Sequence, residues 1–227
     1  MIQLKKVSKV FSNGLKVLDN IELTVQKNEF LYLVGPSGAG KSTLLKLIFR
    51  EQHPSQGEIY IDNFLLNTIQ ADQIPYLRRN IGVVFQDFKL LPKRTVFENI
   101  AFALRFLNYS RRRLRRQVTQ VLSLVGLNEK MSRLPSELSG GEQQRICIAR
   151  AIVNNPSILL ADEPTGNLDP DTSIDIIQLL SKINLLRNTT MIVATHNQAI
   201  VNDIRKRVIE LKNGKIVRDQ QLGAYCQ

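Results

Sequence analysis

A glycine-rich octapeptide constrains this chain more than any other feature of its sequence. Residues 35–42 read Gly-Pro-Ser-Gly-Ala-Gly-Lys-Ser, directly after the apolar run Phe30–Val34 and directly before leucines at helical spacing in 41–49. Glycines let backbone N–H groups approach an anion at the start of a helix. A strand, a glycine loop and a helix in this order therefore predict an α/β fold with a phosphate-binding loop.

We expect this loop to hold the phosphates of a nucleotide. Lys41 suits the β- and γ-phosphates, and the Ser42 hydroxyl suits Mg²⁺. A tight turn that only joins a strand to a helix requires neither of these two side chains. The residues that we expect around the phosphates are Gly35, Pro36, Ser37, Gly38, Ala39, Gly40, Lys41, Ser42 and Thr43.

Two adjacent carboxylates follow a second apolar run. Asp162 and Glu163 come at the end of Ile158–Ala161, and α/β sheets place ligands at the carboxyl ends of their strands. Asp162 suits the Mg²⁺ shell, and Glu163 suits the general base that polarises an attacking water. The alternative, a pair of ordinary charges at a helix N-terminus, does not explain their place downstream of a phosphate loop.

The remaining patterns predict a single α/β domain with an insertion. Apolar runs at 157–161 and 190–194 flank a helical pattern at 172–186, and this alternation predicts a parallel sheet. We expect the α/β core, with an N-terminal antiparallel β-subdomain, in 1–85 and 157–227. We expect an inserted, mostly helical subdomain in about 86–156.

Two turn signals predict β-hairpins. Asn13-Gly14 separates the strand patterns at 2–10 and 17–25, and Asn213-Gly214 separates those at 207–211 and 215–217. Asn-Gly pairs accept the positive φ angles that two-residue turns require. Both hairpins are therefore predicted to have two-residue turns.

A second glycine motif opens another helical pattern. Ser139 and Glu142 have the spacing of a capping box, in which each side chain bonds the backbone of the other residue. Gly140 and Gly141 lie between them and each cost a helix about 1 kcal/mol relative to alanine. A cap alone does not favour them, whereas bare glycine backbone at a helix N-terminus predicts a second anion site.

With Gln86, Asn167-Leu168-Asp169 and His196 in this order, these motifs resemble those of ABC ATPases along nearly the whole chain. The resemblance implies ATP and Mg²⁺ as cofactors and a head-to-tail dimer of two copies. In that dimer Ser139, Gly140, Gly141 and Glu142 of one copy cover the ATP that the other copy's loop holds.

The resemblance also implies individual roles. Gln86 is expected to take part in catalysis by linking Mg²⁺ to the partner surface, Asp169 to form a contact across the dimer, and His196 to contact the γ-phosphate. A lone histidine after a strand is more often a satisfied structural residue. Phe11 fits the position at which the family stacks the adenine, and a core phenylalanine of the β-layer is the alternative.

Within this family, residues 163–169 resemble the branch that serves lipoprotein release, macrolide-type export and bacterial cell division. Residues 83–92 and 95–99 are similar to those of the FtsE family of cell-division ATPases. That resemblance implies the membrane protein FtsX as partner, control of cell-wall hydrolysis at the septum, and a peripheral place on the cytoplasmic face of the membrane. The ATPase of a lipoprotein-release or macrolide-type exporter is the alternative.

The apolar side chains of this stretch have two interpretations. Phe88, Leu90, Leu91 and Phe97 lie among basic residues, a composition suited to gripping a partner helix. Packing inside the helical subdomain is the other interpretation.

The net charge of +11 is concentrated in one segment. The segment between Glu98 and Glu129 has no acidic residue and contains six arginines. They are Arg105, Arg111, Arg112, Arg113, Arg115 and Arg116. The run at 111–116 suits anionic lipid or a solvated surface, and both readings stay open.

Charge alone also suits nucleic acid. The relatives that handle nucleic acid carry a long coiled coil between the two glycine motifs, or two ATPase halves, and this sequence has neither. We therefore expect no nucleic-acid partner. Cys147 and Cys226 have no metal-ligand spacing, which favours a reducing compartment, and no apolar stretch is long enough for a signal peptide or a membrane helix.

Overall fold

The strand that precedes the glycine loop lies inside a six-stranded sheet. In the computed structural model, which describes residues 2–223, all residues of β3 (Phe30–Val34) are buried. The sheet has the order β10-β9-β3-β8-β7-β6. Its other strands are β6 (Ile81–Val84), β7 (Ile158–Asp162), β8 (Thr190–Ala194), β9 (Arg207–Lys212) and β10 (Lys215–Gln220). All neighbours pair in parallel except β9 and β10, so the predicted parallel core is confirmed.

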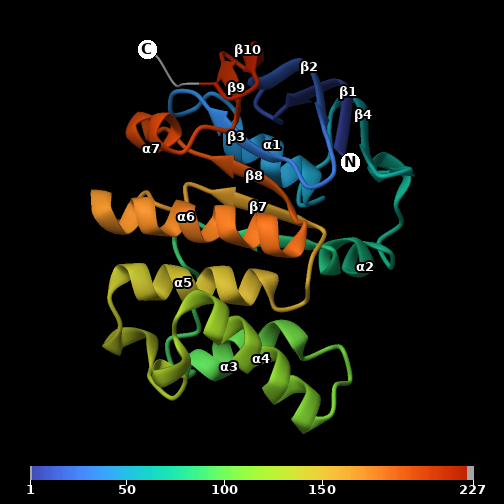
Figure 1. Ribbon diagram of the computed structural model, residues 1–227. Helices are drawn as coiled ribbons and strands as arrows, with labels where there is room; N and C mark the ends of the chain where they lie inside the picture. The colour runs from blue at the N-terminus through green and yellow to red at the C-terminus, as the bar shows by residue number, and fades with distance from the viewer. Residues whose placement is uncertain (1, 224–227) are drawn as a thin grey trace.

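Helices cover both faces of this sheet, which explains the continuous apolar run in β3. Phe30, Tyr32 and Val34 enter one hydrophobic core, and Leu31 and Leu33 enter the other. The first core contains residues of α5 (Gly140–Ile152) and α6 (Pro170–Arg187). The second contains residues of α1 (Lys41–Ile48) and the β-layer. Figure 1 shows α5 and α6 running side by side below the strands.

The predicted antiparallel β-layer is a four-stranded sheet of order β2-β1-β4-β5. Its strands are β1 (Ile2–Val10), β2 (Lys16–Val25), β4 (Gln56–Ile61) and β5 (Phe64–Leu65). The prediction of a two-residue turn at Asn13-Gly14 is wrong, because the strands stop pairing at Val10 and Lys16. The Asn13 side chain accepts a hydrogen bond from Leu15 N, so this asparagine shapes a five-residue loop instead.

The second hairpin has the predicted two-residue turn. Lys212 pairs with Lys215, and Asn213 and Gly214 both have positive φ, at 49° and 74°. These are the angles of the turn whose twist matches that of the flanking strands.

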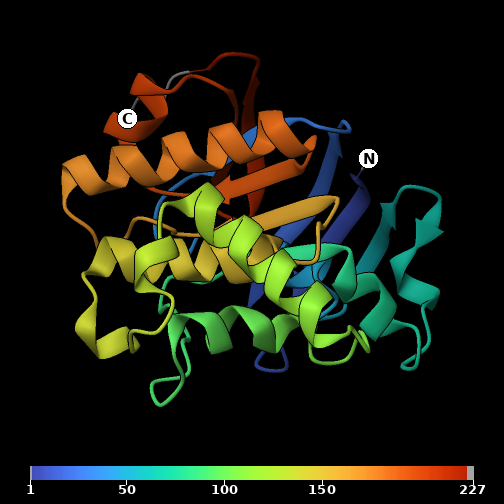
Figure 2. The same ribbon diagram turned by 60° about the horizontal axis from the view of Figure 1, so that its bottom comes forward.

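The helical segment forms the end of the molecule that lies away from the antiparallel sheet (Figure 1, Figure 2). It contains α3 (Val96–Ala101), α4 (Arg111–Val125) and α5. Thr95 caps α3, Ser110 caps α4, and Gly126 ends α4 in the left-handed conformation. The expected boundary at 86–156 stays a prediction, since α5 also packs against β6.

Several short elements were not predicted from the sequence. They are α2 (Ile74–Arg79), α7 (Gln198–Asp203), and the 3₁₀ turns Leu66–Thr68, Phe102–Leu104, Asn128–Lys130 and Pro135–Glu137. Over residues 2–223, no helix has both the length and the apolar character needed to cross a membrane.

Candidate functional site

The glycine loop runs from the end of β3 to the start of α1 in backbone conformations that require glycine. Gly35 and Gly40 have φ of 141° and 105°. A Cβ on Gly35 would lie 2.1 Å from the carbonyl oxygen of Leu211, and one on Gly40 would lie 2.7 Å from Leu18 Cδ2. The loop therefore packs closely against β9 at Leu211 and against β2 at Leu18. Its backbone N–H groups precede α1, where the helix dipole favours an anion.

Lys41 is held inside the loop. Its side chain is 7% exposed, and its Nζ donates hydrogen bonds to the carbonyl oxygens of Gly35 and Pro36 at 2.7 and 3.2 Å. It also lies 3.7 Å from Glu163 Oε1. The first residue of α1 thus places an ammonium group beside the carboxylate that follows β7.

Ser42 and Asp162 bring two oxygen ligands together. The Ser42 hydroxyl donates a hydrogen bond of 2.9 Å to Asp162 Oδ1, across 120 residues of sequence. Burial is the main influence on the Asp162 carboxyl and raises its pKa, while the bond from Ser42 opposes this. A hydroxyl and a carboxylate at the edge of a phosphate site fit Mg²⁺, which binds proteins through few oxygen ligands and keeps several waters.

Glu163 and His196 meet at the carboxyl ends of neighbouring strands. Glu163 follows β7 with φ of 48°, and its N–H donates to the carbonyl oxygen of Ala194. This unusual backbone conformation turns the side chain so that its Oε1 lies 2.9 Å from His196 Nδ1. The carboxylate is 13% exposed and the imidazole 64%, so the pair has a sheltered and an open end.

These groups line one cavity of about 690 Å³. Its lining comprises Phe11, Leu15, Val17, Pro36, Ser37, Gly38, Ala39, Gly40, Lys41, Ser42, Thr43, Gln86, Glu163, His196 and Gln198. Phe11 belongs to the cavity rather than to either hydrophobic core. Leu15, Val17 and Gln198 were missed, and no sequence pattern singled them out.

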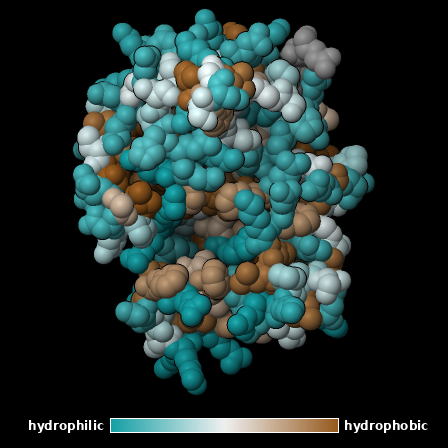
Figure 3. All heavy atoms as spheres, turned by 180° about the vertical axis from the view of Figure 1, so that it is seen from behind, coloured by the Kyte–Doolittle hydropathy of each residue, from teal (hydrophilic) through white to brown (hydrophobic). Residues whose placement is uncertain are grey.

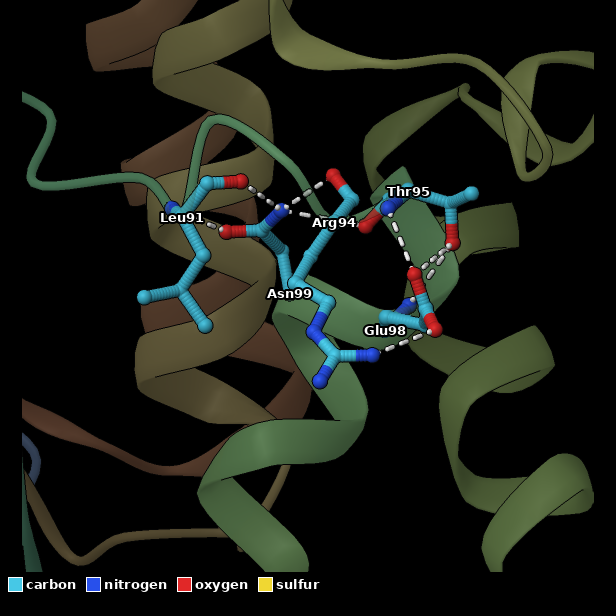
Figure 4. Close-up of polar contacts among 5 residues, drawn as sticks. All are labelled: Leu91, Arg94, Thr95, Glu98 and Asn99. Carbon is cyan, nitrogen blue, oxygen red and sulfur yellow. Dashed lines mark hydrogen bonds and ion pairs between the residues drawn. The ribbon is translucent and has the colours of Figure 1, made fainter.

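Gln86 begins a loop that leads to α3 and is anchored by the buried side chain of Asn99. The Asn99 side chain is fully buried. Its Oδ1 accepts from Leu91 N at 2.8 Å, and its Nδ2 donates to the carbonyl oxygens of Leu91, Arg94 and Thr95 at 3.1, 2.9 and 3.0 Å (Figure 4). Asn99 thereby ties the loop to the first turn of α3, where Thr95 and Glu98 form a capping box.

The second glycine motif forms the N-terminal tip of α5. Ser139 and Glu142 form the predicted capping box. Gly141 has a packing role that the sequence did not reveal, because a Cβ there would lie 2.5 Å from Thr172 Cγ2. A larger residue at this position would therefore have to displace the Thr172 side chain where α5 meets α6.

The predicted site residues thus fall into two groups. The cavity gathers the glycine-loop residues from 36 to 43 with Phe11, Gln86, Glu163 and His196, and Asp162 is bonded to Ser42 at its edge. Among the described residues, the lining includes neither the tip of α5 nor Asp169. Asp169 instead caps α6 by accepting from Thr172 N, and this bonding lowers its pKa.

Comparison with known proteins agrees with this geometry. The family model described as ABC transporter matches residues 18–166. The cell division ATP-binding protein FtsE of Bacillus subtilis is 54% identical over 99% of this chain and 98% of its own length. The protein of the same name from Mycobacterium tuberculosis is 49% identical over 99% and 98%.

A solved structure of similar fold is the dimeric cassette MJ0796 in a post-hydrolysis state bound to ADP and Pi. Its TM-score is 0.88 at 39% identity, and the match covers 99% of this chain and 100% of that one. The ABC ATPase fold predicted from the sequence, with its parallel core and antiparallel β-layer, is thus confirmed. By sequence, fold and phosphate-loop geometry, the chain belongs to the ABC transporter family.

Proposed function

We propose that this chain is the ATP-binding and ATP-hydrolysing subunit of a membrane complex that acts in cell division. The observation that carries the chemistry is the convergence of Lys41, Glu163 and His196 on one glycine-loop cavity. A cation for the phosphates and a carboxylate for the water are the parts that phosphoryl transfer to water needs.

In this proposal the loop from Gly35 to Thr43 binds the triphosphate through its backbone N–H groups. Lys41 balances the charge of the β- and γ-phosphates, and Phe11 offers its ring to the adenine. Ser42, Asp162 and Gln86 would hold Mg²⁺, and this ion would neutralise charge on the phosphate oxygens.

Glu163 is the proposed general base. It orients a water for attack on the γ-phosphorus and accepts its proton, while the bond to the β,γ-bridging oxygen breaks and ADP leaves. His196, whose Nδ1 contacts this carboxylate, is proposed to contact the γ-phosphate with the other end of its ring. The sheltered position of Glu163 supports the assignment because exclusion of water strengthens such contacts.

The active form is proposed to be a head-to-tail dimer. The tip of α5 does not line the cavity of its own chain, so a second copy has to supply the anion site formed by Ser139, Gly140, Gly141 and Glu142. Asp169 is proposed to contact the partner copy. The dimeric state of the MJ0796 cassette supports this arrangement.

The identity to FtsE proteins over nearly the full chain supports a role with an FtsX-type membrane partner at the cytoplasmic face of the membrane. Control of cell-wall hydrolysis at the septum follows from this assignment. The segment 86–156 is proposed to be the subdomain that transmits the partner's movement.

A groove of about 800 Å³ is the proposed docking site for the membrane partner. It lies between α2 and β6 on one side and, on the other, the segment 102–107 that follows α3 and the end of α5. Phe102 and Phe106 line it and are 47% and 75% exposed, and exposed aromatic residues mark protein contact sites. Hydrophobic residues border the hollow between the upper and lower parts of the molecule in Figure 3.

The charged start of α4 is proposed to touch anionic lipid beside this partner. The arginines at 111–116 are exposed, and no carboxylate of residues 2–223 pairs with them. Arg113 lies over the Tyr109 ring at 3.9 Å. Each such cation is worth up to about 1 kcal/mol near an anionic surface.

Vesicle sedimentation tests the lipid contact. The chain is expected to sediment with anionic vesicles and not with neutral ones, and Arg112→Gln/Arg113→Gln/Arg116→Gln is expected to abolish this. The control Lys182→Gln/Arg205→Gln/Lys212→Gln removes the same charge from exposed positions elsewhere. Equal sedimentation of both variants would refute the contact, as would preference for nucleic acid over vesicles.

ATP turnover by the complex with the co-encoded membrane protein tests the function itself. Glu163→Gln is expected to bind ATP and stop hydrolysis, and Lys41→Ala is expected to weaken binding. Normal turnover by the Glu163 variant would show that the general base has been assigned wrongly. Co-purification with an exporter's membrane subunit instead would favour the alternative complex.

A further inference from the structure

The first turn of α5 contains a carboxylate, at the end of the helix where the proposed function places a triphosphate. Glu142 is the third residue of this helix. A carboxylate in the first turn stabilises a lone helix through the dipole. The same charge opposes the approach of a second anion to that end, since like charges at this range repel.

Both oxygens of this carboxylate have partners. Oε2 accepts a hydrogen bond of 3.0 Å from Ser139 N. Oε1 accepts a short hydrogen bond from Lys130 Nζ. Lys130 ends the 3₁₀ turn Asn128–Lys130 and is twelve residues away in sequence, so the contact joins two separate segments of the helical region.

The ion pair with Lys130 keeps the Glu142 carboxylate charged and at the same time balances its negative charge. The bond from Lys130 is the main reason why the pKa of Glu142 is lowered, so protonation does not remove the charge at neutral pH. Among the described residues, Lys130 is the only cation in an ion pair with Glu142. Without Lys130 the tip would present an uncompensated carboxylate to the phosphates.

We infer that Lys130 is a positioning residue for the ATP-bound dimer. It cancels the charge of Glu142 and holds this side chain in the capping box on Ser139 N, so that the backbone N–H groups of Gly140 and Gly141 face the γ-phosphate of the partner copy without opposition. The inference rests on the proposed dimer and adds a residue that lies outside both glycine motifs.

A purely structural role predicts a different outcome. The Lys130 and Glu142 side chains are 44% and 25% exposed, and exposed ion pairs contribute little to stability. Loss of Lys130 should therefore leave the melting temperature nearly unchanged. An effect on dimerisation that vanishes when Glu142 is neutral is specific to charge compensation.

The test is a double-mutant cycle in the full chain together with its membrane partner. Lys130→Gln, Glu142→Gln and the double variant are compared for the ATP concentration that gives half-maximal dimer and for the KM of turnover. Dimer formation is measured in the Glu163→Gln background. Arg133→Gln is the matched control. Arg133 lies three residues after Lys130 and pairs with Glu137 at 2.9 Å, so this substitution removes the same charge from another ion pair.

Lys130→Gln is expected to raise both concentrations about tenfold, as one uncompensated charge near the phosphates would do, without lowering the melting temperature. In the Glu142→Gln background Lys130→Gln should have no further effect on either concentration. High salt should reduce the difference in these concentrations between Lys130→Gln and the native chain. The inference is overturned if Lys130→Gln behaves like Arg133→Gln, or if Lys130→Gln raises the two concentrations in the Glu142→Gln background as much as it does in the native chain. Absence of a dimer with Lys130 and Glu142 both intact would instead refute the proposed function.

Discussion

The fully buried Asn99 allows the sharpest stability prediction. Its replacement by alanine removes the bonds to Leu91 N and to Leu91 O, which leaves a backbone donor and a backbone acceptor without their partner. Each unsatisfied buried group costs about 1–3 kcal/mol. Because Leu91 is only partly buried and water reaches some of this surface, Asn99→Ala is expected to cost roughly 2–4 kcal/mol of unfolding free energy.

For a chain of this length, 1 kcal/mol shifts the melting temperature by about 2–4 °C. Asn99→Ala should therefore lower it by roughly 4–16 °C in a thermal scan. Asn80→Ala is the control, since Asn80 is exposed and its side chain donates one bond of 3.4 Å to Tyr76 O. Asn99 does not line the nucleotide cavity, so ATP binding should persist.

Asn99→Asp separates the bonds from the shape of the side chain. Aspartate keeps an acceptor for Leu91 N but loses the donor and places a carboxylate beside three carbonyl oxygens (Figure 4). It should destabilise at neutral pH at least as much as alanine, and less in acid where the carboxyl is protonated. If Asn99→Ala melts within 1 °C of the native chain, the reasoning about this loop is wrong.

Three further outcomes follow from packing and burial. Gly141→Ala should lower the melting temperature, because the alanine Cβ meets Thr172 Cγ2. Adding Thr172→Ser, which removes the threonine methyl group, should restore the melting temperature. Failure to restore it would refute the packing explanation. Phe106→Glu should abolish co-purification with the membrane partner, whereas Phe64→Glu, at a similarly exposed position, should not. Equal behaviour of the two variants would refute the groove as the docking site. Leu90→Glu should mainly lower stability, because Leu90 packs against the core. Burial raises the pKa of the Cys147 thiol to about 12, so in a Cys226→Ser chain stability should fall as pH rises above the ordinary thiol pKa of about 8.5; urea titrations at pH 7.5 and 9.5 that show no such fall would contradict this.

The phosphate loop and its carboxylates were predictable because each depends on local order. A strand, glycines and a helix leave few alternatives for residues 35–42, and β7 delivers Asp162 and Glu163 to the same sheet edge. His196, which lines the cavity, was singled out only through the family resemblance, and its contact with the γ-phosphate stays a prediction.

The failures have a local and a tertiary cause. Asn13-Gly14 gave a turn of the wrong length for a local reason, because the Asn13 side chain accepts a hydrogen bond from Leu15 N within a longer loop. The packing of Phe88, Leu90 and Phe97 against the core favours the second of the two interpretations given to that stretch, and the exposed aromatic residues lie instead at Phe102 and Phe106. No periodicity distinguishes these two cases.

The packing role of Gly141 was not predicted, and its anion-site role stays a proposal. Glycine at a helix N-terminus indicated an anion site, whereas the contact with Thr172 depends on how α5 and α6 approach each other. The importance of Asn99 was hidden for the same reason, because its partners are backbone groups that the sequence does not specify.

The most direct test of the account is the mass of the Glu163→Gln chain in sedimentation, with saturating Mg²⁺ and ATP and its membrane partner present. We expect two copies of this chain and two nucleotides per particle, and a return to single copies when Ser139→Glu places a charge on the tip of α5. A single copy under saturating nucleotide, or a dimer indifferent to Ser139→Glu, would contradict it.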